Sequence, residues 1–184
     1  MERARPQANA IAVFGSSEPM EGDPLYESSR RLGRLLVSSG REVWTGGYGG
    51  IMEGASRGAS EAGGSAVGVV CAIFDSRRQN RYLSRAVVTR DLHERSRALI
   101  EGVRGYVVFP GKSGTLAELT LVWALHRAGS LDRRPVVLLG AEWRHLLRHL
   151  EHAGMLDSSQ HEITRTVDTP EEAVKAIEAF PMEV

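Results

Sequence analysis

The chain has 184 residues, which is long enough for one domain with a full hydrophobic core and too short to expect two. Its 23 Lys and Arg residues balance 23 Asp and Glu residues, so the charge gives no indication of a nucleic-acid or membrane partner. The single cysteine, Cys71, excludes a disulfide framework and a cysteine metal cluster. No apolar run approaches membrane-spanning length, and we expect a cytoplasmic protein whose residues 1–9 form a flexible tail.

Strand-like apolar runs alternate with helix-like segments along the chain. The strand-like runs cover residues 10–17, 42–47, 66–74, 85–90, 105–111, 134–140 and 162–168. The helix-like segments cover residues 24–40, 50–64, 91–103, 114–129, 141–154 and 169–180. Because the strand-like runs are apolar throughout, they predict a parallel sheet with helices on both faces. We therefore expect an α/β fold, a Rossmann-like doubly wound parallel sheet that forms a single domain over residues 1–184.

Small turns rich in backbone N–H groups follow three of the strand-like runs. In a doubly wound fold, ligands bind at the carboxyl ends of the strands, so these three turns would open onto the same edge of the sheet. Each turn taken alone is equally well explained as a tight connection, but together they favour an anion or nucleotide site. The first turn lacks the third glycine of the dinucleotide fingerprint, so the pattern does not favour NAD or NADP. The candidate binding residues are Gly15, Ser16 and Ser17; Gly46, Gly47, Gly49 and Gly50; and Gly111, Ser113, Gly114 and Thr115.

The third turn contains the letters GKS, which invite comparison with a nucleotide-binding P-loop. That motif needs a glycine five residues before the Gly-Lys pair, and Tyr106 occupies this position, so Lys112 is not a Walker lysine. The turn leads instead into the helix-like segment 114–129. Backbone N–H groups at the start of that helix would face an anion placed above the strand.

Glu118 lies about one turn into this helix, and its position has two compatible interpretations. The letters TLAE match a capping box in which Thr115 begins the helix and Glu118 bonds back to it. Alternatively, Glu118 is a carboxylate at the mouth of a phosphate site, facing the sugar of a nucleotide. In segment 91–103, arginines such as Arg95 have the chemistry to clamp a phosphate, although a solvated charged face explains Glu94 and Arg97 equally well.

Several other patterns have structural explanations. The small residues of segment 50–64 indicate close packing of a helix against the sheet or another copy of the chain. No carboxylate or cysteine completes a metal site with His145, His149 and His152, so we expect no metal. The apolar helix segment 119–129 favours a dimer contact. The tryptophans are expected as core or interface anchors, at Trp44, Trp123 and Trp143.

Between about Ala10 and Leu150 the chain resembles the LOG family of cytokinin riboside 5′-monophosphate phosphoribohydrolases, once described as lysine decarboxylases. The resemblance rests on GGYGGIMEGASRGASEAGG, on HERSRALIEGVRGYVVFPGKSGTLAEL and on AIAVFGSS. The family motif PGGxGTxxE reads here as PGKSGTLAE, from Pro110 to Glu118, and the upstream arginine of the family matches Arg95. Lys112 replaces the second glycine of the motif, and Ser96 stands where a lysine follows the arginine.

The resemblance implies a homodimer that hydrolyses the N-glycosidic bond of a nucleoside 5′-monophosphate, such as AMP or an N6-substituted AMP, without a metal or redox cofactor. Arg95 and Glu118 would be the catalytic residues. The GKSGT turn, Lys112 included, would bind the 5′-phosphate, and Met52 would lie against the base. Molybdenum cofactor carrier proteins, which have a similar glycine-rich anion site, provide the alternative of a binding protein. Lysine decarboxylation has no support, because no pyridoxal phosphate site can be recognised in the sequence.

Overall fold

The computed structural model describes residues 9–74 and 78–181, and strands alternate with helices over most of this part of the chain, as the sequence predicts. Two helices, where the sequence predicts one, precede the last strand. The strands are β1 (Ala10–Phe14), β2 (Glu42–Thr45), β3 (Ala66–Cys71), β4 (Arg85–Thr89), β5 (Gly105–Val108), β6 (Val136–Leu139) and β7 (Thr164–Val167). The helices are α1 (Pro24–Ser38), α2 (Ile51–Glu61), α3 (Leu92–Glu101), α4 (Ser113–Arg127), α5 (Ala141–His152), α6 (Ser158–Ile163) and α7 (Pro170–Glu178). A short 3₁₀ turn, η1 (Ala72–Phe74), follows β3.

The strands form one seven-stranded sheet in the order β4-β3-β2-β1-β5-β6-β7, and every pairing between neighbours is parallel. The chain builds outward from β1 to one edge and then returns to add β5 on the other side of β1. The order therefore reverses between β1 and β5, which is where doubly wound folds bind their ligands. The predicted Rossmann-like α/β fold is confirmed.

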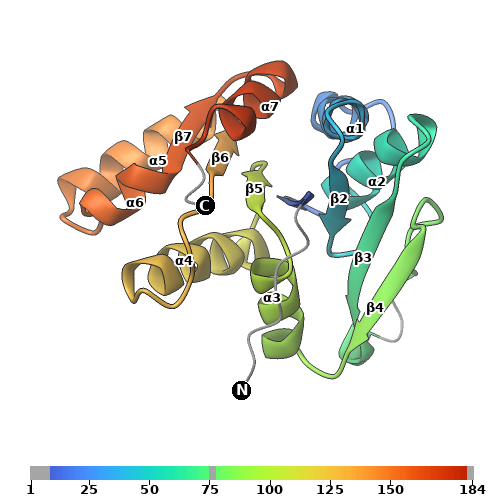
Figure 1. Ribbon diagram of the computed structural model, residues 1–184, viewed down its shortest axis with the longest axis horizontal. Coiled ribbons are helices and arrows are strands. Elements are labelled where there is room, and N and C mark those ends of the chain that lie inside the picture. The colour runs from blue at the N-terminus through green and yellow to red at the C-terminus, as the bar shows by residue number, and fades with distance from the viewer. Residues whose placement is uncertain (1–8, 75–77, 182–184) are drawn as a thin grey trace.

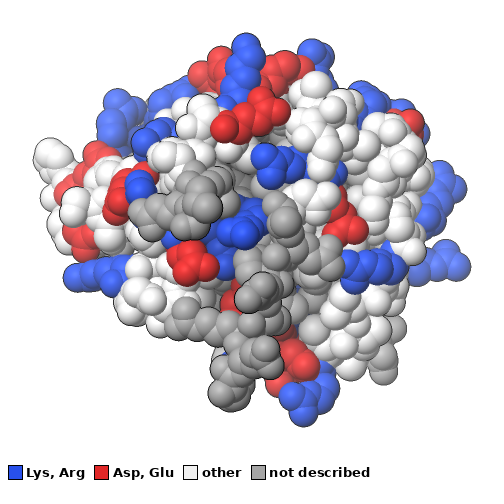
Figure 2. Space-filling view, viewed as in Figure 1, with Lys and Arg blue, Asp and Glu red and all other residues white. Residues whose placement is uncertain are grey.

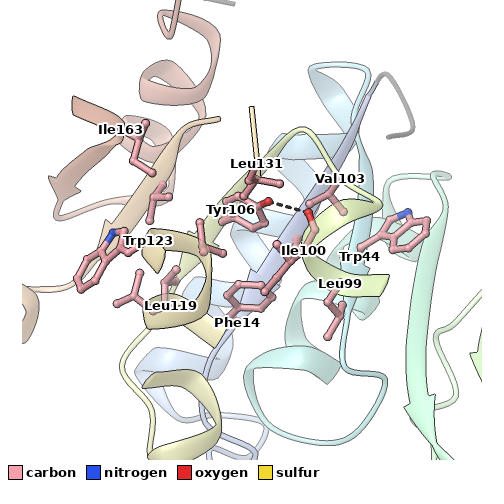
Figure 3. Close-up of a cluster of buried hydrophobic side chains, with 14 of the residues drawn as sticks. Phe14, Trp44, Leu99, Ile100, Val103, Tyr106, Leu119, Trp123, Leu131 and Ile163 are labelled. Carbon is pink, nitrogen blue, oxygen red and sulfur yellow. Dashed lines mark hydrogen bonds between the residues drawn. The ribbon is translucent and has the colours of Figure 1, made fainter. Parts of the chain in front are cut away.

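Alternate residues of β1 supply the two hydrophobic cores, one on each face of the sheet. Ile11 and Val13 pack with α1, α2 and α7, whereas Ala10, Ala12 and Phe14 pack with α3, α4 and α5. Figure 1 shows α1 and α2 on one side of the sheet and α3 and α4 on the other. The second core also holds the buried Tyr106, whose hydroxyl donates to the Ile100 carbonyl oxygen at 2.7 Å (Figure 3). Burial on both faces explains why β1, β3, β5 and β6 are apolar throughout, whereas the edge strands β4 and β7 are more exposed and carry polar residues.

The three tryptophans belong to the core. Trp44, Trp123 and Trp143 are all buried, and Figure 3 shows Trp44 beside α3 and Trp123 on α4. Cys71 is buried at the end of β3, as a small hydrophobic residue would be.

The small residues of α2 allow a close contact with α1 rather than with the sheet alone. A Cβ atom at Gly54 would come within 2.1 Å of the Ser29 hydroxyl oxygen, and one at Gly58 within 1.8 Å of the Arg30 carbonyl oxygen. The helix backbones therefore approach more closely than any larger side chain permits, which explains why glycines are kept in a helix interior despite their unfavourable propensity.

The start of the last strand and the N-terminal tail differ from the sequence prediction. The strand-like run 162–168 begins inside α6, because Asp157 and Gln160 form a capping box that starts a helix ahead of β7. The expected tail 1–9 falls on residues 1–8, which lie outside the described residues, and on Asn9. The Asn9 carbonyl oxygen accepts from the N–H of Glu42 in β2 at 3.0 Å, so this residue is tied to the sheet.

Candidate active site

The three glycine-rich turns meet at the carboxyl edge of the sheet, where the strand order reverses. Ser16, just after β1, lies between the other two turns and is hydrogen-bonded to both. Its N–H donates to the Pro110 carbonyl oxygen at 3.2 Å, and its carbonyl oxygen accepts from the Ile51 N–H at 2.9 Å. The geometry thus brings together turns that lie far apart in the sequence.

A cavity of about 450 Å³ opens between these turns. Most of the predicted site residues line it, namely Gly15, Ser16, Ser17, Gly46, Met52, Arg95, Lys112, Ser113, Gly114, Thr115 and Glu118. The sequence prediction missed further lining residues, which are Val13, Phe14, Glu18, Tyr48, Phe74 and Leu92. Tyr48 lies inside GGYGG, but nothing in the sequence pattern distinguishes Phe74, in η1, or Leu92, the first residue of α3, from other apolar residues near the ends of elements.

The remaining predicted glycines, Gly47, Gly49, Gly50 and Gly111, lie in the turns and not in the cavity lining. Gly50 has a φ of 71°, and a Cβ there would come within 2.3 Å of the Ser16 carbonyl oxygen. A Cβ at Gly111 would lie 2.2 Å from the Thr115 hydroxyl oxygen. These two glycines therefore allow the close contacts that hold the turns in place, although neither glycine lines the cavity.

The start of α4 forms one wall of the cavity, with free backbone donors. Helix α4 begins at Ser113, and Lys112 at its N-cap makes no side-chain capping bond. Ser113, Gly114 and Thr115 form the first helical turn and line the cavity. N–H groups of a first helical turn have no partner within the helix, and together with the helix dipole they favour an anion.

The predicted TLAE capping box is wrong. Thr115 is the third residue of α4 and is buried, not the residue that begins the helix. The Glu118 side chain accepts a hydrogen bond from Arg95 and does not reach back to Thr115. Because the helix starts earlier than the pattern suggests, the carboxylate points into the cavity.

Arg95 and Glu118 form a nearly buried ion pair at the base of the cavity. The Arg95 Nη1 atom lies 3.3 Å from the Glu118 Oε1 atom, and their side chains are only 12% and 11% exposed. The Arg95 Nε–H donates to the Val69 carbonyl oxygen at 2.9 Å, and its guanidinium lies 5.9 Å from the Tyr48 ring centroid. A Cβ at Gly46 would lie 1.8 Å from the Arg95 Nη2 atom, so glycine is required there for the arginine to take this place.

Burial changes the acidity of this site. Removal from water raises the pKa of the Glu118 carboxyl to about 7, although the neighbouring Arg95 guanidinium opposes the shift. A carboxyl group with such a pKa exchanges its proton near neutral pH. Perturbed carboxyl groups in a cleft are typical of catalytic sites.

The two departures from the family motif lie in different surroundings. Lys112 has a φ of −94°, an ordinary extended conformation that a lysine adopts as readily as a glycine. Its ammonium group forms an ion pair with Glu18 at the mouth of the cavity, where both side chains are exposed. Ser96 is half-buried on α3 and does not line the cavity.

The other charged residues of α3 and the histidines of α5 lie away from the cavity. Arg90 pairs with Glu94 at 3.1 Å on the surface, and Arg97 is exposed, as expected for a solvated face. His145, His149 and His152 are exposed on α5. Across residues 9–74 and 78–181, no group of three metal-binding side chains comes together, and no helix has the length and apolarity needed to cross a bilayer. Figure 2 shows Lys and Arg interspersed with Asp and Glu on the face in view.

Comparison with known proteins supports the resemblance of this chain to the LOG family. Residues 52–177 match the model of a family described as "possible lysine decarboxylase". A cytokinin riboside 5′-monophosphate phosphoribohydrolase of Rhodococcoides fascians is 29% identical over 158 residues, which cover 83% of this chain and 79% of that protein. The X-ray structure of TM1055, a structural genomics target, superposes with a TM-score of 0.73 at 32% identity, covering 92% of this chain and 98% of that one.

A molybdenum cofactor binding protein from Rippkaea orientalis has the same fold, with a TM-score of 0.73 at 22% identity over 97% of this chain and 98% of that one. At this identity the likeness concerns the fold alone. The family match covers more than half of the chain and includes both Arg95 and Glu118. This chain therefore belongs to the lysine-decarboxylase-like family, which is the LOG family that its motifs resemble.

Proposed function

We propose that this chain is a phosphoribohydrolase that cleaves the N-glycosidic bond of a nucleoside 5′-monophosphate, with AMP or an N6-substituted AMP as substrate. The bond between ribose C1′ and the base nitrogen breaks, water supplies the hydroxyl group to C1′, and its proton goes to the base. The products are the free base and ribose 5-phosphate. The observation that carries this proposal is the buried Arg95–Glu118 pair beside the free N-terminus of α4.

The two ends of the cavity suit the two ends of such a substrate. The backbone N–H groups of Ser113, Gly114 and Thr115, with Ser16 and Ser17 opposite, suit the 5′-phosphate. Met52, Tyr48 and Phe74 supply apolar surface at the other end, where a purine base would lie. The ribose would then lie between them, close to Glu118.

Glu118 provides the chemistry that this reaction needs. Cleavage of the glycosidic bond develops positive charge on the ribose ring, and a fixed carboxylate stabilises that charge in a site shielded from water. Arg95 holds the carboxylate in place through the 3.3 Å contact and helps to keep it ionised. In its ionised form Glu118 also accepts a hydrogen bond from the ribose hydroxyls or from the attacking water. The reaction uses no redox cofactor and no metal.

A carrier of a phosphate-bearing cofactor, such as the molybdenum cofactor, is the second candidate. Two features favour a carrier: the free N–H groups at the N-terminus of α4, which suit an anion, and the fold shared with the Rippkaea orientalis protein. A carrier has no need of a buried carboxyl group with a raised pKa, such as that of Glu118, beside the anion site. The Arg95–Glu118 pair therefore favours the enzyme. Lysine decarboxylation gains no support, since Lys112 lies in an exposed ion pair.

Incubation with AMP, GMP, CMP, UMP and N6-isopentenyl-AMP, with the free base followed by chromatography, tests the proposal. Wild-type protein should release a base from at least one purine nucleotide, and Glu118→Gln and Arg95→Ala should both abolish release. Circular dichroism controls for folding of the variants. A folded wild-type protein that releases no base from any of these nucleotides contradicts the enzyme and leaves the carrier.

We also propose that the protein acts in the cytoplasm as a homodimer, without a nucleic-acid or membrane partner. Leu121 is exposed on α4, within the segment 119–129 that the sequence indicates for a dimer contact, and Leu116 is exposed five residues earlier on the same helix. Light scattering after size exclusion should give twice the mass of one chain, and Leu121→Glu should give monomers. A monomeric wild-type protein contradicts this assembly.

A further inference from the structure

A buried polar side chain, Asn80, lies behind the glycine-rich turn that follows β2. Asn80 comes from the connection between η1 and β4 and is only 7% exposed. Its backbone N–H donates to the Gly47 carbonyl oxygen at 2.9 Å, and its side-chain amide donates to the Tyr48 carbonyl oxygen at 3.1 Å. The Asn80 side-chain oxygen accepts from the Tyr82 N–H at 3.2 Å, which orients the amide. Asn80 therefore fixes the backbone of two successive turn residues.

Two hydroxyl groups complete the support of this turn. The Thr45 hydroxyl oxygen accepts from the Gly47 N–H at 3.1 Å and lies 3.4 Å from the Ser56 hydroxyl oxygen. The Asn80 amide nitrogen lies 3.5 Å from the same Ser56 oxygen. Buried polar groups are costly unless their hydrogen bonds are made, so this satisfied network holds the turn in one conformation.

Tyr48 connects this network to the ion pair. Its phenol oxygen accepts from the Cys71 N–H at 3.0 Å, which anchors the ring at the end of β3. The ring lies beside the Arg95 guanidinium, 5.9 Å from centroid to carbon, in a cation–π contact. Arg95 in turn contacts Glu118 at 3.3 Å. A continuous chain of contacts thus runs from Asn80 through Tyr48 and Arg95 to Glu118.

We propose that Asn80 is a positioning residue of the active site, which holds Tyr48, and through it Arg95, in register with Glu118. Asn80 does not line the cavity, so it acts through the turn and not on the substrate. Its role in turnover rests on the proposed function, whereas its role in placing Arg95 does not.

The first experiment separates positioning from general stability. Asn80→Ala removes the amide, and Asn80→Asp keeps the acceptor for Tyr82 while placing an acceptor against the Tyr48 carbonyl oxygen. Gln160→Ala is the matched control, because Gln160 is also a buried amide, 8% exposed, with a local hydrogen-bonding role in a capping box. We expect both Asn80 variants to lower kcat by about 10- to 100-fold with KM changed less than about threefold. Gln160→Ala should keep kcat within about twofold at a comparable loss of melting temperature.

The second experiment tests whether Asn80 acts through Tyr48. In a double-mutant cycle, Asn80→Ala should lower kcat much less in a Tyr48→Ala background than in the wild type. Gln160→Ala should combine additively with Tyr48→Ala. Additive losses from Asn80 and Tyr48, or equal losses of kcat in Asn80→Ala and Gln160→Ala, overturn the proposal.

A readout without turnover separates this proposal from the proposed function. The Arg95 Nε–H resonance, identified by its absence in Arg95→Ala, should shift and exchange faster with water in Asn80→Ala, and should stay unchanged in Gln160→Ala. If the wild-type protein hydrolyses no nucleotide, the proposed function fails while this measurement still tests Asn80. An Arg95 resonance that Asn80→Ala leaves unmoved overturns the positioning role, whatever the activity.

Discussion

The same four-residue pattern, Thr-x-x-Glu, occurs at the start of α4 and at the start of α7, and it is used in two different ways. At α7, Thr169 accepts from the Glu172 N–H and Glu172 bonds back to Thr169, so the pattern forms a capping box. At α4, Thr115 lies inside the helix and Glu118 bonds to Arg95 from another helix. One glutamate satisfies its own helix end, while the other leaves that end open to a ligand. A local pattern therefore does not decide the role of a carboxylate; a cationic partner from elsewhere in the fold does.

Removing the carboxylate at each position gives the largest expected contrast. Glu118→Gln should lower kcat by about 10³-fold, because it removes the charge that stabilises the transition state. Glu172→Gln should leave kcat unchanged and lower the free energy of unfolding by about 1 kcal/mol or less, since it weakens only a cap. Steady-state kinetics and urea unfolding measure both. A large loss of activity in Glu172→Gln would contradict the assignment of a catalytic role to Glu118 and a purely capping role to Glu172.

The second-largest effect is expected when the Arg95 guanidinium is displaced from Glu118. The new methyl group in Gly46→Ala would lie 1.8 Å from the Arg95 Nη2 atom, so the guanidinium must leave its present position beside Glu118 or the turn must shift. We expect kcat to fall by about 100-fold, as for other small misplacements of catalytic groups. The capping box of α7 does not depend on Arg95 and should keep its stability, as hydrogen exchange of the α7 amides would show. Unchanged kcat in Gly46→Ala would contradict the role of Arg95.

The pH dependence should have opposite signs for carboxyl groups of the two helices. Burial raises the pKa of Glu118 from 4.5 to about 7, so the folded protein binds more protons than the unfolded chain in this range. Its contribution to stability is full below pH 4.5 and falls, by about 3 kcal/mol in total, as the pH rises to 7. The pKa of Glu171 in α7 is lowered, chiefly by a backbone hydrogen bond, so its smaller contribution is lost as the pH falls.

Unfolding by urea between pH 4.5 and 8, for the wild type and Glu118→Gln, measures this difference. The wild type should lose stability relative to the variant as the pH rises. Activity should rise through an apparent pKa near 7, because the ionised carboxylate is the active form. A flat difference between the two proteins would show that Glu118 has an ordinary pKa.

The smallest effect is expected from giving α4 the cap that α7 has. Lys112→Asn places a capping side chain at the N-cap of α4, where it would accept from the N–H groups of the first turn. The helix should gain about 1 kcal/mol, and KM for the nucleotide should rise several-fold because the cap competes with the phosphate. Lys112→Gly is the control, since it removes the ammonium group without adding a strong cap. A KM equal to that of Lys112→Gly would mean that the phosphate does not use these N–H groups.

Much of the fold follows from the sequence, because uniformly apolar strands and intervening helices leave few other arrangements. The boundary between α6 and β7 could not be predicted from the sequence. The capping box at Asp157 starts a helix that extends through Ile163, although the strand-like run 162–168 includes this residue. At the site, the sequence identified the turns and the Arg95 and Glu118 side chains. The sequence could not decide whether Glu118 caps α4 or serves as a catalytic carboxylate, because its role depends on the residue at which α4 begins. Nor could it find Asn80, which lies 32 residues from Tyr48 in the chain and meets it only after folding.

The position of β1 at the centre of the sheet has a consequence for how the protein is made. Strand β1 is synthesised first, and β2 covers one of its edges soon afterwards. Its other edge pairs with β5, which begins at Gly105, so this edge stays exposed until more than a hundred residues have left the ribosome. An uncovered apolar strand edge is a template for aggregation. We therefore expect the reversal of strand order that creates the binding crevice to leave one edge of β1 open to aggregation until β5 has been made.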